Sequence, residues 1–317
     1  MSIFGGSTDY KSFYTEYGAL LLGAALDKYC YVTVKNLPNF SPNHFEVYYS
    51  KVEKVKSVED IQNPGVRGTL QFIKERHPEL KDLAIYIQNE LPSQSGVGSS
   101  SCLIVGLLNA VYHYLGYTPS KRQLAQDAIH IERVLLAEPG GIQDAIFSAY
   151  GGVSSLDIAK DGYFTIRPLP ISEDFLVKLK KSCVMFYLGG ERASFDIAKS
   201  HDDVKAEGHK LSIHDIAQKA EQAFIKEDVE EIGRLMHESW IQKRGISNLI
   251  SNSYVDDIYN KVMVNGVLGG KVMGAGGSGF LFCICADGKR RQQAIQSIDL
   301  PYIEPGFNFT GSEIILI

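Results

Sequence analysis

Apolar residues along the chain recur at two different spacings. In the segment KRQLAQDAIHIERVLL, the side chains of Leu124, Ala128 and Ile131 stand three or four positions apart, which predicts an amphipathic helix. Residues 18–35 instead end in tyrosines that alternate with small or β-branched residues, which is typical of a strand. The same two spacings predict further helices at about residues 66–76, 100–115 and 211–250, and further strands at about residues 83–88, 182–190, 280–285 and 312–317.

The predicted helices and strands are mixed without the regular strand–helix–strand repeat of a doubly wound sheet. Residues 142–170 are turn-rich and strand-like, and Pro168 and Pro170 end this stretch. Two prolines so close together favour a domain boundary. The pattern therefore predicts an α+β fold with two lobes, residues 1–170 and residues 171–317.

Composition narrows the class of protein. The 317 residues are 44% hydrophobic and 22% charged, which is ordinary for a globular protein with a substantial core. The net charge is −5 and no basic tract occurs, which argues against a nucleic-acid partner, although backbone dipoles can still bind a small polyanion.

The cysteines and the longest apolar runs bear on the compartment. The five cysteines have apolar flanks and form no C-x-x-C pair, which predicts free thiols in a reducing compartment. No apolar run approaches 18 residues, and the N-terminus lacks the pattern of a signal peptide. We therefore expect a cytoplasmic protein without membrane contact.

The stretch PSQSGVGSSSC, residues 92–102, passes from glycine and serine directly into the apolar pattern of a helix. The first N–H groups of a helix are unpaired and carry partial positive charge, so a loop without obstructing Cβ atoms can wrap an anion there. An ordinary N-terminal cap with a flexible lead-in is the alternative, and this stretch alone leaves both open. The anion-binding interpretation gives these nucleotide-binding residues: Pro92, Ser95, Gly96, Val97, Gly98, Ser99, Ser100 and Ser101.

A second glycine run, Gly274 to Gly279, matches the pattern G-x-G-x-x-G. The dinucleotide fingerprint of that form follows a strand and opens a helix, whereas here the strand-like FLFCIC follows the glycines. No lysine follows either glycine run in the way that a Walker loop requires. Both of these phosphate-binding motifs are therefore disfavoured.

Three separated stretches resemble the signature motifs of the GHMP kinases. They are FGGSTDY (4–10), PSQSGVGSSSC (92–102) and KVMGAGGSGFLF (271–282), in the family's order and at matching separations. Within that superfamily, residues 4–34, 132–152 and 237–252 are most similar to the D-glycero-D-manno-heptose 7-phosphate kinases and related sugar kinases. The resemblance implies a two-lobed fold with the active site in the cleft between the lobes.

The activity implied by this resemblance is transfer of the γ-phosphate of ATP, with Mg²⁺, to a sugar hydroxyl. The anomeric hydroxyl of D-glycero-D-manno-heptose 7-phosphate is the expected acceptor. The resemblance also implies a small-molecule sugar or sugar-phosphate substrate, no nucleic acid and no membrane partner, and it leaves a homodimer open.

The resemblance also assigns roles to single residues. Asp144 matches the family's catalytic base, a carboxylate that accepts the proton of the attacking hydroxyl. Glu132, twelve residues earlier, and Ser100 are the expected magnesium ligands, with Ser99 close enough to be confused with Ser100. Asp9 is expected to bind sugar hydroxyls. Without the resemblance, Asp144 would be a helix cap, Glu132 a solvated residue and Asp9 a turn residue.

The remaining substrate-binding candidates are glycine-loop residues and three basic side chains. The basic residues are suited to a substrate phosphate, although solvated surface charges are an equal alternative. Together with Asp9, the expected substrate-binding residues are Gly5, Gly6, Ser7, Thr8, Gly141, Arg192, Lys243, Arg244, Gly274, Ala275, Gly276 and Gly277.

Two departures from the family pattern keep other functions open. The first motif lacks its usual Pro-x-Arg segment, which indicates a start placed too far downstream, a shortened chain, or a compensating Lys or Arg elsewhere. Ala145 stands where many related sugar kinases carry glutamine. The alternatives are a catalytically weak or silent nucleotide- or sugar-binding protein, or a kinase for another sugar or small alcohol such as mevalonate.

Overall fold

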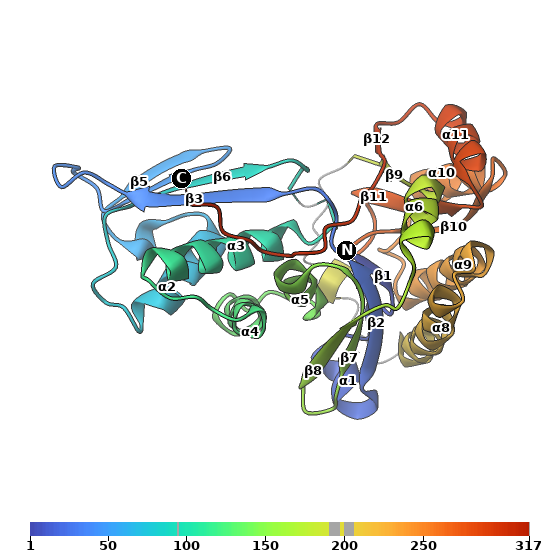
Figure 1. Cartoon of the computed structure of the whole chain (residues 1–317), viewed down its shortest axis with the longest axis horizontal. Helices are drawn as coiled ribbons and strands as arrows, with labels where there is room; N and C mark the ends of the chain where they lie inside the picture. The colour runs from blue at the N-terminus through green and yellow to red at the C-terminus, as the bar shows by residue number, and fades with distance from the viewer. Residues whose placement is uncertain (94, 190–196, 200–205, 317) are drawn as a thin grey trace.

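Three four-stranded sheets organise the computed structural model, which describes residues 1–317 except 94, 190–196, 200–205 and 317. Each sheet is covered by helices on at least one face, and the sheets follow one another along the long axis of the molecule (Figure 1). The α+β class predicted from the sequence is confirmed.

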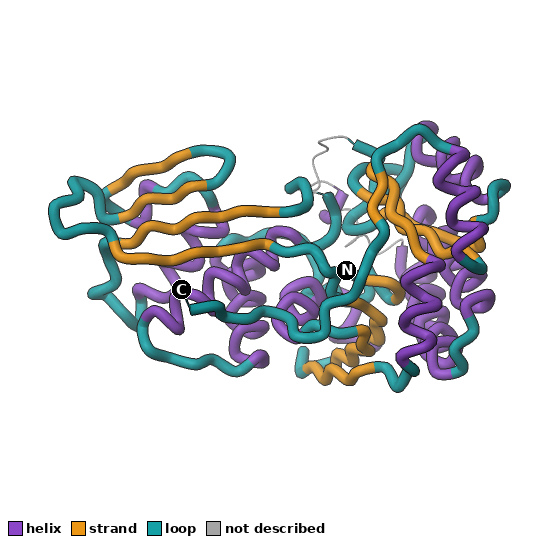
Figure 2. The backbone as a smooth tube through the Cα atoms, turned by 45° about the horizontal axis from the view of Figure 1, so that its top comes forward, coloured by secondary structure: helices purple, strands orange, loops and turns teal. Residues whose placement is uncertain are grey.

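The first sheet forms the end of the molecule farthest from the second lobe. Its strand order is β3-β6-β4-β5, and β4 and β6 are its one parallel pair within the described structure. Two helices, α2 and α3, cover one face, whereas the other face carries no helix (Figures 1 and 2). The bounds are β3 Cys30–Asn36, β4 Phe45–Tyr48, β5 Val52–Val55, β6 Leu83–Asn89, η1 Val58–Asp60, α2 Pro64–Lys74 and α3 Ser99–Tyr114.

The middle sheet lies between the first and the third sheet and is antiparallel, in the order β1-β2-β7-β8. Helices α4 and α5 pack against each other between this sheet and α3. The bounds are β1 Ser2–Phe4, α1 Lys11–Tyr17, β2 Ala19–Ala24, α4 Lys121–His130, the π-helical turn η2 Ile131–Leu135, α5 Gln143–Tyr150, β7 Val153–Ile158 and β8 Phe164–Pro168.

The third sheet has the order β10-β11-β9-β12 and belongs to the second lobe. Helices α8 and α9 form an antiparallel pair, and α9 packs directly on β10. The bounds are α6 Glu173–Ser182, β9 Cys183–Tyr187, α8 Glu207–Ile225, α9 Val229–Ile246, α10 Ser253–Met263, β10 Val267–Val272, β11 Phe280–Cys285, α11 Gly288–Ser297 and β12 Tyr302–Ile303.

Three clusters of buried apolar side chains hold the sheets and helices together. One cluster fills the space between the first sheet, α2, α3, α4 and α5. A second joins β1, β2 and β7 of the middle sheet to α8, α9 and one face of β11. The third lies on the opposite face of the third sheet, against α10 and α11. The middle sheet thus packs through buried apolar side chains on elements of both flanking layers.

The segment after β12 returns to the first lobe (Figure 1). Phe307 forms a β-bridge with Leu26, and Asp27 exchanges hydrogen bonds with the backbone of Gly306. Farther along, Lys121 Nζ donates to the carbonyl oxygen of Thr310 at 2.7 Å. The division at residue 170 stays a prediction, and residues 306–313 pack on elements that precede that boundary.

Most of the elements predicted from apolar spacing are present, and the differences have local causes. Residues 18–35 form two strands, because the chain turns between Ala24 and Cys30. Residues 211–250 hold parts of two helices, because Glu227 has a positive φ and Asp228 caps α9. Residues 312–316 form no strand, so that prediction was wrong. An apolar tail can have the composition of a strand, but it forms no strand where no neighbouring strand pairs with its backbone.

Candidate active site

The two glycine loops meet backbone to backbone. Gly96 has a φ of +79°, and a Cβ there would lie 2.5 Å from the carbonyl oxygen of Met273. A Cβ on Gly274 would lie 2.6 Å from the Cα of Gly96. In the same region Phe280 donates its N–H to the carbonyl oxygen of Ser95 at 3.2 Å. Only glycine permits this approach, so the 92–102 and 271–282 stretches are joined at the cleft.

Gly96→Ala is expected to lower the free energy of unfolding by more than the strain of a positive φ alone, which is about 1–2 kcal/mol. The added Cβ would also overlap the backbone at Met273, a contact that flexible side chains cannot relieve. Gly116→Ala is the matched control, because Gly116 has a φ of +85° and no atom within 4 Å of its Cβ position. Urea denaturation compares the two variants. Equal losses of unfolding free energy in the two variants would contradict the close approach of the loops.

Helix α3 begins at the glycine loop without a side-chain cap. Its N-cap residue is Gly98, in the left-handed conformation, and no side chain accepts a hydrogen bond from the first turn. The ordinary serine cap considered for this stretch is therefore not present. The backbone N–H groups of the first turn are left for another acceptor, as an anion site requires.

Glu132 lies beside α3, in the π-helical turn η2 that continues α4. The residue is 1% exposed, and its side-chain Oε1 accepts a hydrogen bond from Ser101 Oγ at 2.6 Å. Its Oε2 pairs with Arg133 Nη2 at 3.1 Å. Burial raises the pKa of Glu132, whereas Arg133 and Ser101 oppose that rise. Ser101 is thus the serine that contacts Glu132, and the predicted Ser100 is exposed instead.

Asp9 follows β1 and is buried against the loop that leads into α5. It is 1% exposed, and its Oδ2 accepts a hydrogen bond from the N–H of Gln143 at 3.1 Å. A Cβ on Gly141 would overlap the Asp9 carboxylate, so glycine is needed there. Asp9 Oδ1 and Gln143 Oε1 are buried without a hydrogen-bond partner among the described residues. Burial raises the pKa of Asp9 from 3.8 to about 6.

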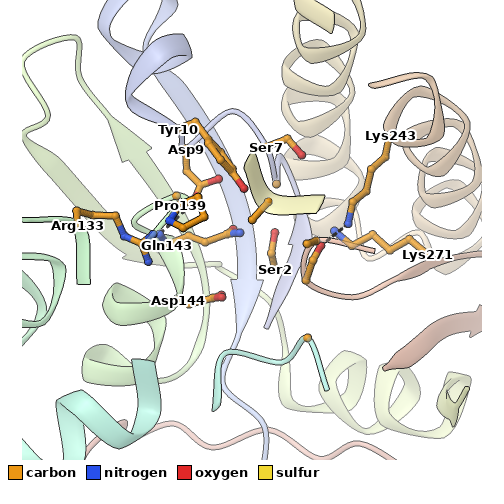
Figure 3. A pocket seen from close by; sticks show the side chains of 17 residues that line it. Ser2, Ser7, Asp9, Tyr10, Arg133, Pro139, Gln143, Asp144, Lys243 and Lys271 are labelled. Carbon is orange, nitrogen blue, oxygen red and sulfur yellow. Dashed lines mark hydrogen bonds between the residues drawn. The ribbon is translucent and has the colours of Figure 1, made fainter. Parts of the chain in front are cut away.

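Asp144 lies in the first turn of α5, next to the glycine loop. A Cβ on Gly98 would lie 3.2 Å from the Asp144 carboxyl carbon, which puts this side chain at the start of α3. The loop residue Gly96 and Asp144 both line one cavity of about 160 Å³. Figure 3 shows Asp9, Arg133, Gln143 and Asp144 on one side of that cavity, with two lysines on the other.

The two lysines are Lys243 on α9 and Lys271 on β10. Lys243 is 6% exposed and donates to the carbonyl oxygens of Val272 at 3.1 Å and Gly274 at 2.6 Å. Lys271 is 4% exposed, and its head group lies beside that of Lys243 (Figure 3). Burial lowers the pKa of Lys243 from 10.5 to about 8. The second lobe therefore supplies the cationic wall of the cavity.

The structure brings together many, but not all, of the residues predicted from the sequence. The predicted residues that line the cavity are Gly6, Ser7, Asp9, Gly96, Gly141, Asp144, Lys243, Gly274 and Ala275. Arg244 does not line it and instead pairs with Asp256 at 3.0 Å and lies over the ring of Trp240. Gly5, Thr8, Gly276 and Gly277 do not line it either, and Arg192 lies outside the described residues.

Sequence reasoning missed several polar residues of the cavity. Ser2, Tyr10, Arg133, Gln143 and Lys271 also line it. Gln143 and Arg133 each stand next to a predicted site residue, and Lys271 is the first letter of the third quoted motif. Proximity to those motifs was therefore the available signal.

Two sequence profiles of one family match the chain on either side of the predicted boundary. The GHMP kinases N terminal domain matches residues 65–152, and the GHMP kinases C terminal domain matches residues 220–303. This chain belongs to the GHMP kinases. The kinase is accordingly an ATP-dependent phosphotransferase that acts on a sugar hydroxyl.

Individual relatives agree with this membership. The kinase is 25% identical over 291 residues to D-glycero-alpha-D-manno-heptose 7-phosphate kinase of Campylobacter jejuni, covering 89% of this chain and 86% of the relative. It is 24% identical to galactokinase of Thermotoga maritima, covering 94% and 91%. The crystal structure of a D-glycero-D-manno-heptose 1-phosphate kinase from Bacteriodes thetaiotaomicron superposes with a TM-score of 0.80 at 21% identity, covering 98% and 94%. The last comparison establishes the shared fold.

None of the helices in the described ranges is long and apolar enough to pass through a membrane.

Proposed function

We propose that this sugar kinase phosphorylates the anomeric hydroxyl of D-glycero-D-manno-heptose 7-phosphate. The observation that carries the proposal is the division of the cavity into two chemically different walls. Asp9 Oδ1 and Gln143 Oε1 are unpartnered acceptors on one wall, suited to sugar hydroxyl donors. Lys243 and Lys271 on the other wall are suited to phosphate. A phosphorylated sugar offers hydroxyl donors to the first wall and a phosphate group to the second. The name of the Campylobacter jejuni relative supports the choice of heptose.

In this proposal Asp144 is the general base. It lies between the acceptor wall and the start of α3, where the transferred phosphate would meet the sugar. Its carboxylate takes the proton of the attacking hydroxyl or holds that hydroxyl in line. The glycine loop from Gly96 to Ser101 holds the triphosphate, since the first turn of α3 has no side-chain cap. Asp9 orients the sugar ring through its hydroxyl groups.

Magnesium fits the donors beside the glycine loop. Mg²⁺ is bound through one or two carboxylates, a hydroxyl and substrate phosphates, with water completing its shell. Glu132 is a buried carboxylate next to the serines of that loop, and Ser101 is the hydroxyl in contact with it. Among the described residues no group of three or more His, Cys, Asp or Glu side chains forms a cage of its own. Glu132 and a loop serine would hold the ion, which supplies charge neutralisation at the phosphates.

The test is a coupled ADP-release assay with Mg-ATP and a panel of acceptors. The panel contains D-glycero-D-manno-heptose 7-phosphate, the dephosphorylated heptose, mannose 6-phosphate, galactose and mevalonate. We expect the highest kcat/KM for the heptose 7-phosphate, a product phosphorylated at the anomeric carbon by NMR, and no turnover without Mg²⁺. A higher kcat/KM for an unphosphorylated sugar or for mevalonate would overturn this substrate assignment.

A further inference from the structure

Lys271 is a lysine of the cavity wall that donates no hydrogen bond within the described residues. It lies on β10, opposite Phe282 of β11, and its side chain is directed into the cavity (Figure 3). Only 4% of the residue is exposed. The three N–H donors of its amino group are therefore open to a ligand in the cavity.

The fold holds Lys271 beside Lys243. Helix α9 approaches β10 so closely that a Cβ on Gly269 would overlap the carbonyl oxygen of Gly233. This contact fixes the helix and the strand that carry the two lysines. Lys243 already donates to the carbonyl oxygen of Val272 at the end of β10 and to that of Gly274 in the glycine loop, and these bonds stabilise its charged form. Lys271 is the lysine whose hydrogen bonds remain to be made.

The charges facing Lys271 come from several elements. Burial lowers the pKa of Lys271 well below 10.5, and the neighbouring charge of Lys243 on α9 lowers it further. Asp144 on α5 and Asp9 after β1 raise it. The Met1 amino group lies close enough to feel the charge of Lys271, and Arg133 of η2 faces the same cavity. An arriving dianion would shift this balance toward the ammonium form.

We propose that Lys271 binds a phosphoryl oxyanion in this cavity. The inference rests on the proposed function for the identity of the substrates, but the binding of an oxyanion can be measured without turnover. The oxyanion has two possible sources, the transferred phosphoryl group of ATP and the phosphate ester of the sugar.

Kinetics of Lys271→Met separate these two sources. Loss of a donor to the transferred group lowers kcat by about 10²–10³-fold on both a phosphorylated and an unphosphorylated sugar. Loss of a contact to the ester instead raises KM for the phosphorylated sugar alone. In either case a Tm close to that of wild type shows that the variant is folded. Wild-type kcat and KM on both sugars would overturn the inference and leave the proposed function intact.

Anion binding can be followed by NMR in the absence of any substrate. In protein labelled with ¹³C-lysine, the resonance of the ε-methylene group responds to the surroundings of each amine, and Lys271→Arg identifies the resonance of Lys271. Replacing sodium chloride by sodium sulfate at equal ionic strength should shift this resonance, since sulfate is a dianion that resembles a phosphoryl group. A resonance of Lys271 that sulfate does not shift would contradict the inference even if no sugar is turned over.

Discussion

Asp144→Asn is expected to lower kcat by about 10²–10⁴-fold, the contribution usual for a general base. Asparagine keeps the shape of the side chain in the first turn of α5 but cannot accept the proton of the attacking hydroxyl. The loop that would hold the triphosphate is unchanged by the substitution, because its backbone and not Asp144 supplies the donors. The Kd for ATP should therefore stay within about threefold of wild type. Single-turnover kinetics and equilibrium nucleotide binding measure the two effects separately.

The control for this variant is Asp161→Asn. Asp161 is exposed and accepts a hydrogen bond from the N–H of Tyr163, which an asparagine oxygen can also accept. This variant should retain wild-type kcat. If Asp144→Asn also retained kcat within twofold, Asp144 would have no part in proton transfer.

Asp9→Asn is expected to weaken sugar binding and to stabilise the free protein. The variant loses a charged acceptor for sugar hydroxyls, and hydrogen bonds to charged groups contribute about 1.5–3 kcal/mol, so the sugar KM should rise about 10–100-fold. The carboxylate is also costly when the cavity holds no sugar, because burial raises its pKa from 3.8 to about 6. At about 1.4 kcal/mol per pH unit, this change corresponds to about 3 kcal/mol.

The sign of the pH dependence follows from that raised pKa. Below pH 3.8 Asp9 is protonated in both the folded and the unfolded state, and its favourable contribution is fully present; it is lost as the pH rises through about 6. Asparagine is neutral throughout, so the gain in unfolding free energy over wild type should be near zero well below pH 3.8, small at pH 4.5 and largest above pH 6.5. Urea denaturation at pH 4.5 and 7.5 measures the gain. A constant gain at both values would contradict a raised pKa for Asp9.

The sequence predicted the fold class and the loops of the site because these depend on local features. Glycines at positive φ and an apolar helix starting at Ser99 are visible as patterns, and the three motifs gave the family. The stretch from Gly96 to Ser101 and the acid Asp144 do lie together at one cleft. Their roles in binding and proton transfer stay predictions.

Other parts of the site depend on contacts that no local pattern reveals. Lys243 and Arg244 are adjacent in sequence, yet a helix turns successive side chains by about 100°, so one enters the cavity and the other pairs with Asp256. Likewise, Ser101 rather than Ser100 contacts Glu132 because the direction of α3 decides which hydroxyl faces η2. Lys271 was missed because the sequence around a single lysine in a strand does not distinguish a buried lysine from an exposed one.

The return of residues 306–313 to the first lobe limits how the cleft can open. Within the described residues the backbone passes from one lobe to the other between β8 and α6, and again between β12 and the bridge of Phe307 with Leu26. These two passages, together with the buried cluster that joins β1, β2 and β7 to α8 and α9, oppose a wide separation of the lobes. A protease cut in residues 169–172 would consequently leave both fragments held together, and the nicked enzyme should still elute as a single species.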